Sequence, residues 1–176
     1  MVKKSRRWQQ GGILMMRAGS HTRAKQQGGG GGPYRGRAGS HTRKHTSAQM
    51  KIEKTIALTF IEMLNTIKLH HWKTMSFATH KATDELYSKL NDNIDTFVEI
   101  MLGKSGGRIN LTNVRSIPVY DFNDEDTFKR KIESYRAFLT NLTLNSNIMH
   151  DNTDLFNVRD ELLANLNQFM YLLTFS

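Results

Sequence analysis

Four segments of this chain repeat apolar residues at three- and four-residue steps, and this periodicity constrains the fold more than any other feature. Such spacing places the apolar side chains on one side of an α-helix, so each segment predicts an amphipathic helix. The expected helices cover about residues 47–75, 79–102, 125–144 and 153–175. Their stripes include Ile56, Phe60, Met63 and Ile67; Leu86, Leu90, Ile94, Phe97 and Met101; Phe128, Ile132, Tyr135 and Leu139; and Leu155, Leu162, Leu166 and Phe169.

The links between these segments differ in length. The first and third links are short, whereas a long stretch separates the second segment from the third. The sequence GKSGG is expected to end the second helix, with Gly103 as its C-cap, since glycine takes the left-handed conformation that ends many helices. We therefore predict an all-α fold, a four-helix bundle with one long crossover between helices 2 and 3.

Residues 1–46 have a different composition. They hold eleven Lys and Arg and no acid, together with ten of the 13 glycines, whereas residues 47–176 hold 14 bases and 16 acids. A Gly/Arg-rich segment of this kind cannot bury enough apolar surface to offset the entropy of ordering. The sequence therefore predicts a disordered basic tail over residues 1–46, followed by a bundle domain over residues 47–176.

The tail contains the sequence RAGSHTR twice, at residues 17–23 and again at residues 37–43. A duplicated basic motif is typical of binding to a polyanion, and DNA or another nucleic acid is the expected partner. A solubilising arm, a localisation signal or a membrane-surface contact are alternatives. The candidate nucleic-acid-binding residues are Lys3, Lys4, Arg6, Arg7, Arg17, Arg23, Lys25, Arg35, Arg37, Arg43 and Lys44.

Several classes of protein are not expected from this sequence. No run of eighteen apolar residues could span a bilayer, the apolar stretch ILMM is too short for a secretion signal, and cysteine is absent, so we expect an intracellular protein without a membrane partner. A small-molecule enzyme is not expected, because the chain has neither a full phosphate-binding loop nor a Gly-x-Ser-x-Gly motif.

The second helix carries a polar stripe beside its apolar one. At about 100° per residue, His80, Asp84, Asp95 and Glu99 fall within an arc of about 100°. At about 1.5 Å per residue, Asp84 and Asp95 are separated by roughly 16 Å and His80 and Glu99 by roughly 28 Å, so one ion cannot contact both ends. Each i,i+4 pair is an incomplete set of ligands for a metal ion.

A second copy of the helix would complete both pairs. Positions 80 and 99, like positions 84 and 95, are centred between Lys89 and Leu90. An antiparallel two-fold dimer centred there brings His80 and Asp84 of one copy to the Asp95 and Glu99 of the other, which creates two equivalent sites.

The expected metal ligands are thus His80, Asp84, Asp95 and Glu99, with His71 as a further imidazole from the end of the first helix. Mixed histidine and carboxylate ligands suit iron, with zinc or manganese as alternatives. Each residue also has an ordinary interpretation. His71 could be a core histidine bonded to a carbonyl, and the carboxylates could be exposed or ion-paired. His70 is expected on the surface.

The residues from His71 to Glu99 resemble the motif of the Dps proteins, the DNA-binding mini-ferritins of the ferritin-like superfamily. The matching elements are His71-Trp72, His80-x3-Asp84 and Asp95-x3-Glu99. The gap from His71 to His80 is nine residues, three fewer than is usual in that family. The same stretch is similar to an uncharacterised family of proteins from large double-stranded DNA viruses, and a basic N-terminus would fit that origin.

The resemblance implies a ferritin-like bundle that forms a two-fold dimer and then a shell of twelve subunits. It implies an intersubunit ferroxidase site that oxidises Fe(II) with peroxide, a stored ferric mineral, and association with DNA through the basic tail. A viral relative would be expected in the virion, the host cytoplasm or the viral factory. The alternative is a non-enzymatic virion structural or genome-packaging protein that keeps the fold without ferroxidase activity.

Overall fold

The computed structural model describes residues 46–145, 148–149 and 152–175, and these residues form four α-helices and no strand. Helix α1 covers Ser47–Lys73, α2 Phe77–Ser105, α3 Glu125–Asn145 and α4 Thr153–Leu172, and a short 3-10 helix, η1, covers Leu173–Phe175. The prediction of an all-helical bundle is confirmed. None of the described helices combines the length and the apolar character needed to cross a bilayer.

The predicted tail, with its eleven candidate Lys and Arg residues, lies outside the described part of the chain except for Thr46. Thr46 is the N-cap of α1, and its side-chain oxygen accepts a hydrogen bond from the backbone N–H of Gln49 at 3.2 Å. The predicted division of the chain at residue 46 stays a prediction.

Both ends of α2 differ from the expected positions. The helix begins at Phe77 because the hydroxyl of Ser76 accepts the backbone N–H of Thr79 at 3.2 Å, a typical N-cap contact. It ends at Gly106, whose φ of 70° is the left-handed conformation, and the backbone N–H of Gly106 donates to the carbonyl of Leu102 at 2.8 Å. The expected cap at Gly103 is therefore wrong, because Gly103 keeps helical geometry and the later glycine ends the helix.

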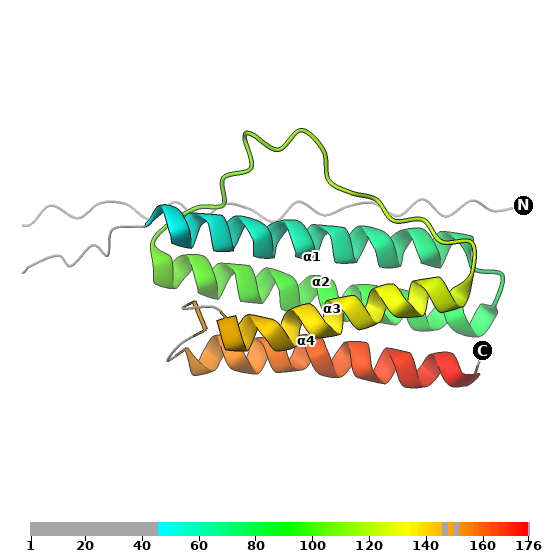
Figure 1. Cartoon of the computed structure of the whole chain (residues 1–176). Coiled ribbons are helices and arrows are strands. Elements are labelled where there is room, and N and C mark those ends of the chain that lie inside the picture. Colours follow the sequence, from blue (N-terminus) through cyan, green and yellow to red (C-terminus); the bar gives the residue numbers. More distant parts are fainter. Residues whose placement is uncertain (1–45, 146–147, 150–151, 176) are drawn as a thin grey trace, which may run out of the picture. The chain divides into compact units, whose positions relative to one another are not determined.

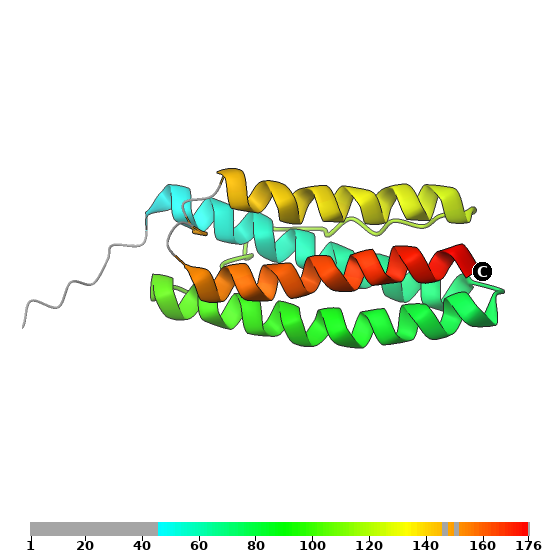
Figure 2. The same cartoon turned by 90° about the horizontal axis from the view of Figure 1, so that it is seen from below.

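The chain path gives two antiparallel hairpins joined by a long connection. Figures 1 and 2 show α1 antiparallel to α2, a connection that runs back along the length of the bundle, and then α3 antiparallel to α4. As a result α3 runs in the same direction as α2. The connection covers residues 106–124 and contains neither helix nor strand, only a turn near residue 112.

The core consists of the predicted apolar stripes. Ile56, Phe60, Leu90, Phe97 and Phe169 are each at most 1% exposed. Phe60 meets Phe97 edge-to-face, with ring centroids 5.4 Å apart, which joins α1 to α2. Burial of these side chains stabilises the fold by about 1.5–3 kcal/mol each.

Polar side chains join α1 to α3 inside the bundle. The hydroxyl of Tyr135 donates to Oε1 of Glu62 at 3.2 Å and lies 3.0 Å from Oγ1 of Thr66. Oε1 of Glu62 is also 2.6 Å from Nζ of Lys131. Tyr135 was expected in the core, but these partners were not predicted.

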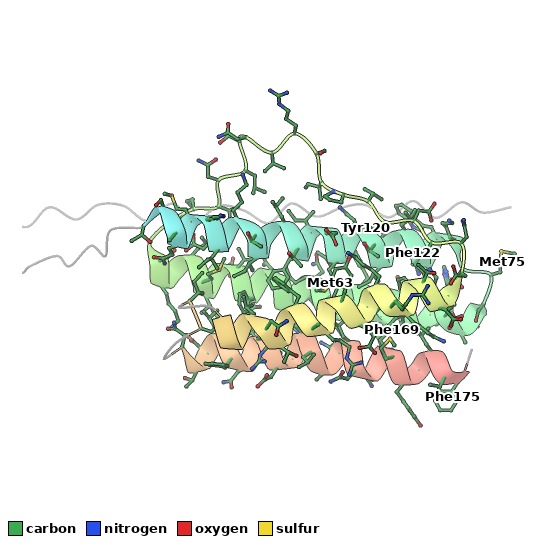
Figure 3. All side chains as sticks on the ribbon, viewed as in Figure 1. Met63, Met75, Tyr120, Phe122, Phe169 and Phe175 are labelled. Atoms are coloured by element: carbon green, nitrogen blue, oxygen red, sulfur yellow. The ribbon has the colours of Figure 1, made fainter. Side chains whose placement is uncertain are left out.

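The end of the connection is held against the same helices. The ammonium of Lys131 lies 3.7 Å from the centroid of the Tyr120 ring, and Lys73 forms an ion pair with Asp121. Tyr120 and Phe122, labelled in Figure 3, lie on the part of the connection that approaches α3. The last residues of the connection, just before α3, are therefore held against both α1 and α3.

Candidate metal site at the α1–α2 turn

The turn between α1 and α2 brings two predicted ligands into contact. His71 is in the last turn of α1 and His80 in the first turn of α2, and their rings stack with centroids 3.9 Å apart and an interplanar angle of 23°. Nδ1 of His71 is 3.0 Å from the carbonyl oxygen of His80, and Nδ1 of His80 is 3.1 Å from the carbonyl oxygen of His71.

This reciprocal contact fixes the tautomer of both rings. A carbonyl oxygen only accepts, so each Nδ1 carries the proton and donates it. The neutral imidazole then has its lone pair on Nε2. A histidine that ligates a metal through Nε2 commonly makes the same Nδ1–H contact to a carbonyl, which orients the ring. Both imidazoles therefore have the hydrogen bonding of metal ligands, which a core histidine can also show.

The buried side chain of Thr83 supports the pair. Oγ1 of Thr83 lies 3.2 Å from Nδ1 of His71 and donates to the carbonyls of Thr79 and His80 at 2.8 Å and 3.0 Å. Thr79 and Thr83 are at most 1% exposed. His71 is buried by this packing, whereas the side chain of His80 is exposed. The gap of nine residues between His71 and His80 therefore still allows the two rings to stack on each other.

Asp84 lies next to the histidines. Its Oδ1 is 3.9 Å from Nε2 of His71 and 3.9 Å from Nζ of Lys68, and its side chain is 59% exposed. Lys68 also lies over the ring of Tyr87. Its place beside Asp84 was not predicted, because a contact between two helices has no signal in the residue spacing along either one.

The remaining two predicted ligands are exposed farther along α2. Asp95 and Glu99 lie on its solvent side, and about eleven residues of helix, roughly 16 Å, separate Asp95 from Asp84. The structure of one chain does not bring them to the histidines, in keeping with the separation expected from the sequence. Within the described residues, no three His, Asp or Glu side chains group closely enough to hold a metal ion.

An apolar hollow adjoins Asp95 on the same face. Its volume is about 260 Å³, and it lies between α1, α2 and the beginning of the connection. Ala57, Ile61, Asn91, Val98 and Leu111 line it together with Asp95.

His70 corrects another expectation. Its ring stacks on Phe128 of α3, with centroids 3.6 Å apart and planes 9° apart, so the side chain is partly buried and not fully on the surface. Burial lowers the pKa of His70 below its ordinary value of 6.5. The ring of His70 thus packs against the buried Phe128 and joins α1 to α3.

The fold and the turn together define a helical-bundle protein with paired, oriented histidines at one end and exposed carboxylates along the neighbouring helix. The chain belongs to a family of unknown function, DUF5856, whose model matches residues 71–173. The match includes all five predicted metal ligands. No curated protein and no solved structure matches this chain.

Proposed function

We propose that this protein is a ferritin-like, Dps-like protein that binds and oxidises iron between two copies of the chain and associates with DNA through its basic N-terminal residues. The observation that carries the metal part is the reciprocal hydrogen bonding of His71 and His80, which leaves both Nε2 atoms free to donate to a metal ion.

Asp84 supplies an oxygen beside these nitrogens. At metal–ligand distances of about 2.0–2.2 Å, two ligands of one ion lie up to about 4 Å apart. The 3.9 Å between Nε2 of His71 and Oδ1 of Asp84 is within that range. Imidazole and carboxylate ligands suit iron, zinc and manganese, of which iron undergoes the oxidation by peroxide that we propose.

A second copy would supply the remaining ligands. His80, Asp84, Asp95 and Glu99 are all exposed on α2, and their positions are symmetric about the point between Lys89 and Leu90. A two-fold dimer centred there pairs each half-site with its complement and covers the apolar hollow beside Asp95. Assembly of such dimers into a twelve-subunit shell is the further step implied by the mini-ferritin resemblance.

The chain path supports the ferritin-like part of the proposal. Bundles of that class have one long crossover, and the two hairpins with the connection along the bundle in Figure 1 have this order. The first residues of the connection line the α1–α2 hollow, whereas Tyr120 packs on Lys131 of α3, so the connection crosses α1.

The metal part is tested by anaerobic titration of the full-length protein with Fe(II), followed by addition of peroxide and measurement of the ferric absorbance. We expect binding and oxidation by the natural protein and loss of both in the variant His80→Ala/Glu99→Ala. A control variant, Ser88→Ala/Thr96→Ala, changes exposed residues of the same helix and should behave as the natural protein does. Equal oxidation by the two variants, or no binding of Fe(II) by the natural protein, would reject the proposal.

A second candidate is a non-enzymatic packaging or virion structural protein that displays basic residues to nucleic acid. The observation that favours it is the charge distribution, since residues 1–46 hold eleven Lys and Arg and no acid, whereas residues 47–176 hold 14 bases and 16 acids. Under this alternative Fe(II) would not bind, whereas nucleic-acid binding would persist. The same titration therefore separates the two candidates.

A further inference from the structure

A second concave site lies at the other end of α1, away from the histidines. It is a cavity of about 290 Å³ between the first turns of α1 and the beginning of the connection. Its polar lining consists mainly of Ser47, Lys51, Lys54, Arg108, Asn110 and Asn113, and we name it the Lys51 cavity.

Three cationic side chains line the Lys51 cavity. Lys51 and Lys54 are three residues apart on α1 and therefore lie on one side of the helix, while Arg108 comes from the connection. None of the three forms an ion pair within the described part of the chain. Glu53 also lines the cavity but is only 1% exposed, so three cations and one acid leave a net charge of +2.

The net positive charge of the Lys51 cavity favours an anion, and uncharged groups add to this preference. Ser47 is the first residue of α1, where the helix dipole places partial positive charge. The side-chain oxygen of Asn110 accepts the backbone N–H of Thr112 at 3.1 Å, which leaves the amide nitrogen of Asn110 to donate. Asn113 lines the same cavity with a second amide. Ammonium, guanidinium and amide donors in a hollow of this size suit a phosphate group.

We propose that the Lys51 cavity binds a backbone phosphate of nucleic acid. Arg43 and Lys44 come shortly before Lys51 in the sequence, so Lys51 and Lys54 extend the basic composition of residues 1–46 along the chain into the first turns of α1. A lipid surface is disfavoured, because the exposed aromatics that would anchor one, Trp72 and Phe77, lie at the opposite end of α1. The inference rests on the nucleic-acid part of the proposed function and is independent of the metal part.

The test uses the full-length protein and a short DNA duplex, with affinity measured over a range of salt concentrations. In the variant Lys51→Gln/Lys54→Gln/Arg108→Gln, we expect the slope of log affinity against log salt to fall by about 2–3. The control Lys81→Gln/Arg115→Gln/Arg130→Gln removes the same charge from exposed positions outside the cavity and should change the slope less. Helical circular dichroism verifies that both variants fold.

Two further measurements localise the contact. Asn113→Trp fills the cavity without a change in charge and should weaken binding. Amine acylation followed by mass spectrometry should show that DNA protects Lys51 and Lys54 several-fold, but not Lys81. The same protection measurement with anionic phospholipid vesicles in place of DNA tests the alternative of a lipid surface.

The outcomes are distinguishable. If the natural protein binds no DNA, the nucleic-acid part of the proposed function fails together with this inference. If it binds DNA but both triple variants have the same slope, or if vesicles alone protect the two lysines, only the inference about the Lys51 cavity is overturned. Iron binding should be equal in all these variants.

Discussion

Nζ of Lys131 lies 2.6 Å from Oε1 of Glu62 and joins α3 to α1 where the two side chains are only 19% and 17% exposed. The variant Glu62→Gln should lower the free energy of unfolding by about 1–3 kcal/mol, because it leaves a largely buried ammonium without its counter-charge. Urea unfolding followed by circular dichroism measures the change.

The double variant Glu62→Leu/Lys131→Leu is the control for this pair. Removal of both charges together leaves no buried ion unpaired, so its stability should lie within about 1 kcal/mol of the natural protein. If the double variant were as unstable as Glu62→Gln, the loss of stability would come from packing and not from the ion pair.

Tyr135 makes stability depend on alkaline pH. Burial raises the pKa of its hydroxyl above the ordinary value of 10.0, so the folded protein keeps a proton that the unfolded chain loses above about pH 10. Fewer protons are then bound in the unfolded state, and stability falls as the pH rises through that value.

The variant Tyr135→Phe should be less stable at neutral pH by about 1–2 kcal/mol, because Glu62 and Thr66 lose a hydrogen-bond partner. Its stability should fall less steeply above about pH 10. Tyr171→Phe, at an exposed position, is the matched control. Parallel curves for all three proteins in urea titrations at increasing pH would contradict the assignment.

Two glycines three residues apart should respond to alanine in opposite ways. Gly106 has a φ of 70°, so Gly106→Ala strains the backbone and should cost about 1–2 kcal/mol. Gly103 is helical and a Cβ there meets nothing within 4 Å, so Gly103→Ala should stabilise by up to about 1 kcal/mol. Thermal unfolding of the two variants compares them directly, and the reverse order would restore Gly103 as the cap.

These glycines illustrate what the sequence could predict. The apolar stripes of Phe60, Leu90 and Phe169 gave the helices and their buried sides, because helical spacing is a local property. The choice between Gly103 and Gly106 could not be predicted, since both are glycines near the end of the same stripe and only the backbone conformation separates them.

The candidate site was predictable to a similar extent. The spacing of His80, Asp84, Asp95 and Glu99 indicated a common side of α2. All four are exposed on that helix, and their role as metal ligands stays a prediction. The bonds between His71 and His80 involve main-chain carbonyls across a turn, and main-chain carbonyls have no sequence signal. The stacking of His70 on Phe128 likewise depends on how α1 meets α3.

Association with nucleic acid should depend strongly on salt through the N-terminal residues. Deletion of residues 1–45 removes eleven cations. The slope of log affinity against log salt for duplex binding should therefore fall by several units, since each neutralised phosphate contributes about 0.9 to that slope. Replacement of the seven arginines of that segment by lysine keeps the charge and should preserve the slope. A deletion variant with the natural slope would exclude residues 1–45 as the contact.

Mixtures of two inactive variants should test whether each iron site uses two chains. In the proposed dimer, one site takes His80 and Asp84 from the first copy and Asp95 and Glu99 from the second, and the other site takes the reverse. A dimer of one His80→Ala chain and one Glu99→Ala chain therefore has one site with both changes and one site with all of its natural ligands.

Each variant alone should oxidise Fe(II) poorly, because every site in it lacks one ligand. After unfolding and refolding together, about half of the chains should pair as mixed dimers, and each mixed dimer should regain one site, so that about a quarter of the sites are natural. Fe(II) oxidation by peroxide in the mixture should rise accordingly, while the same mixture of two His80→Ala samples stays inactive. If the ligands acted within one chain, mixing would restore nothing, since no chain in the mixture holds both His80 and Glu99.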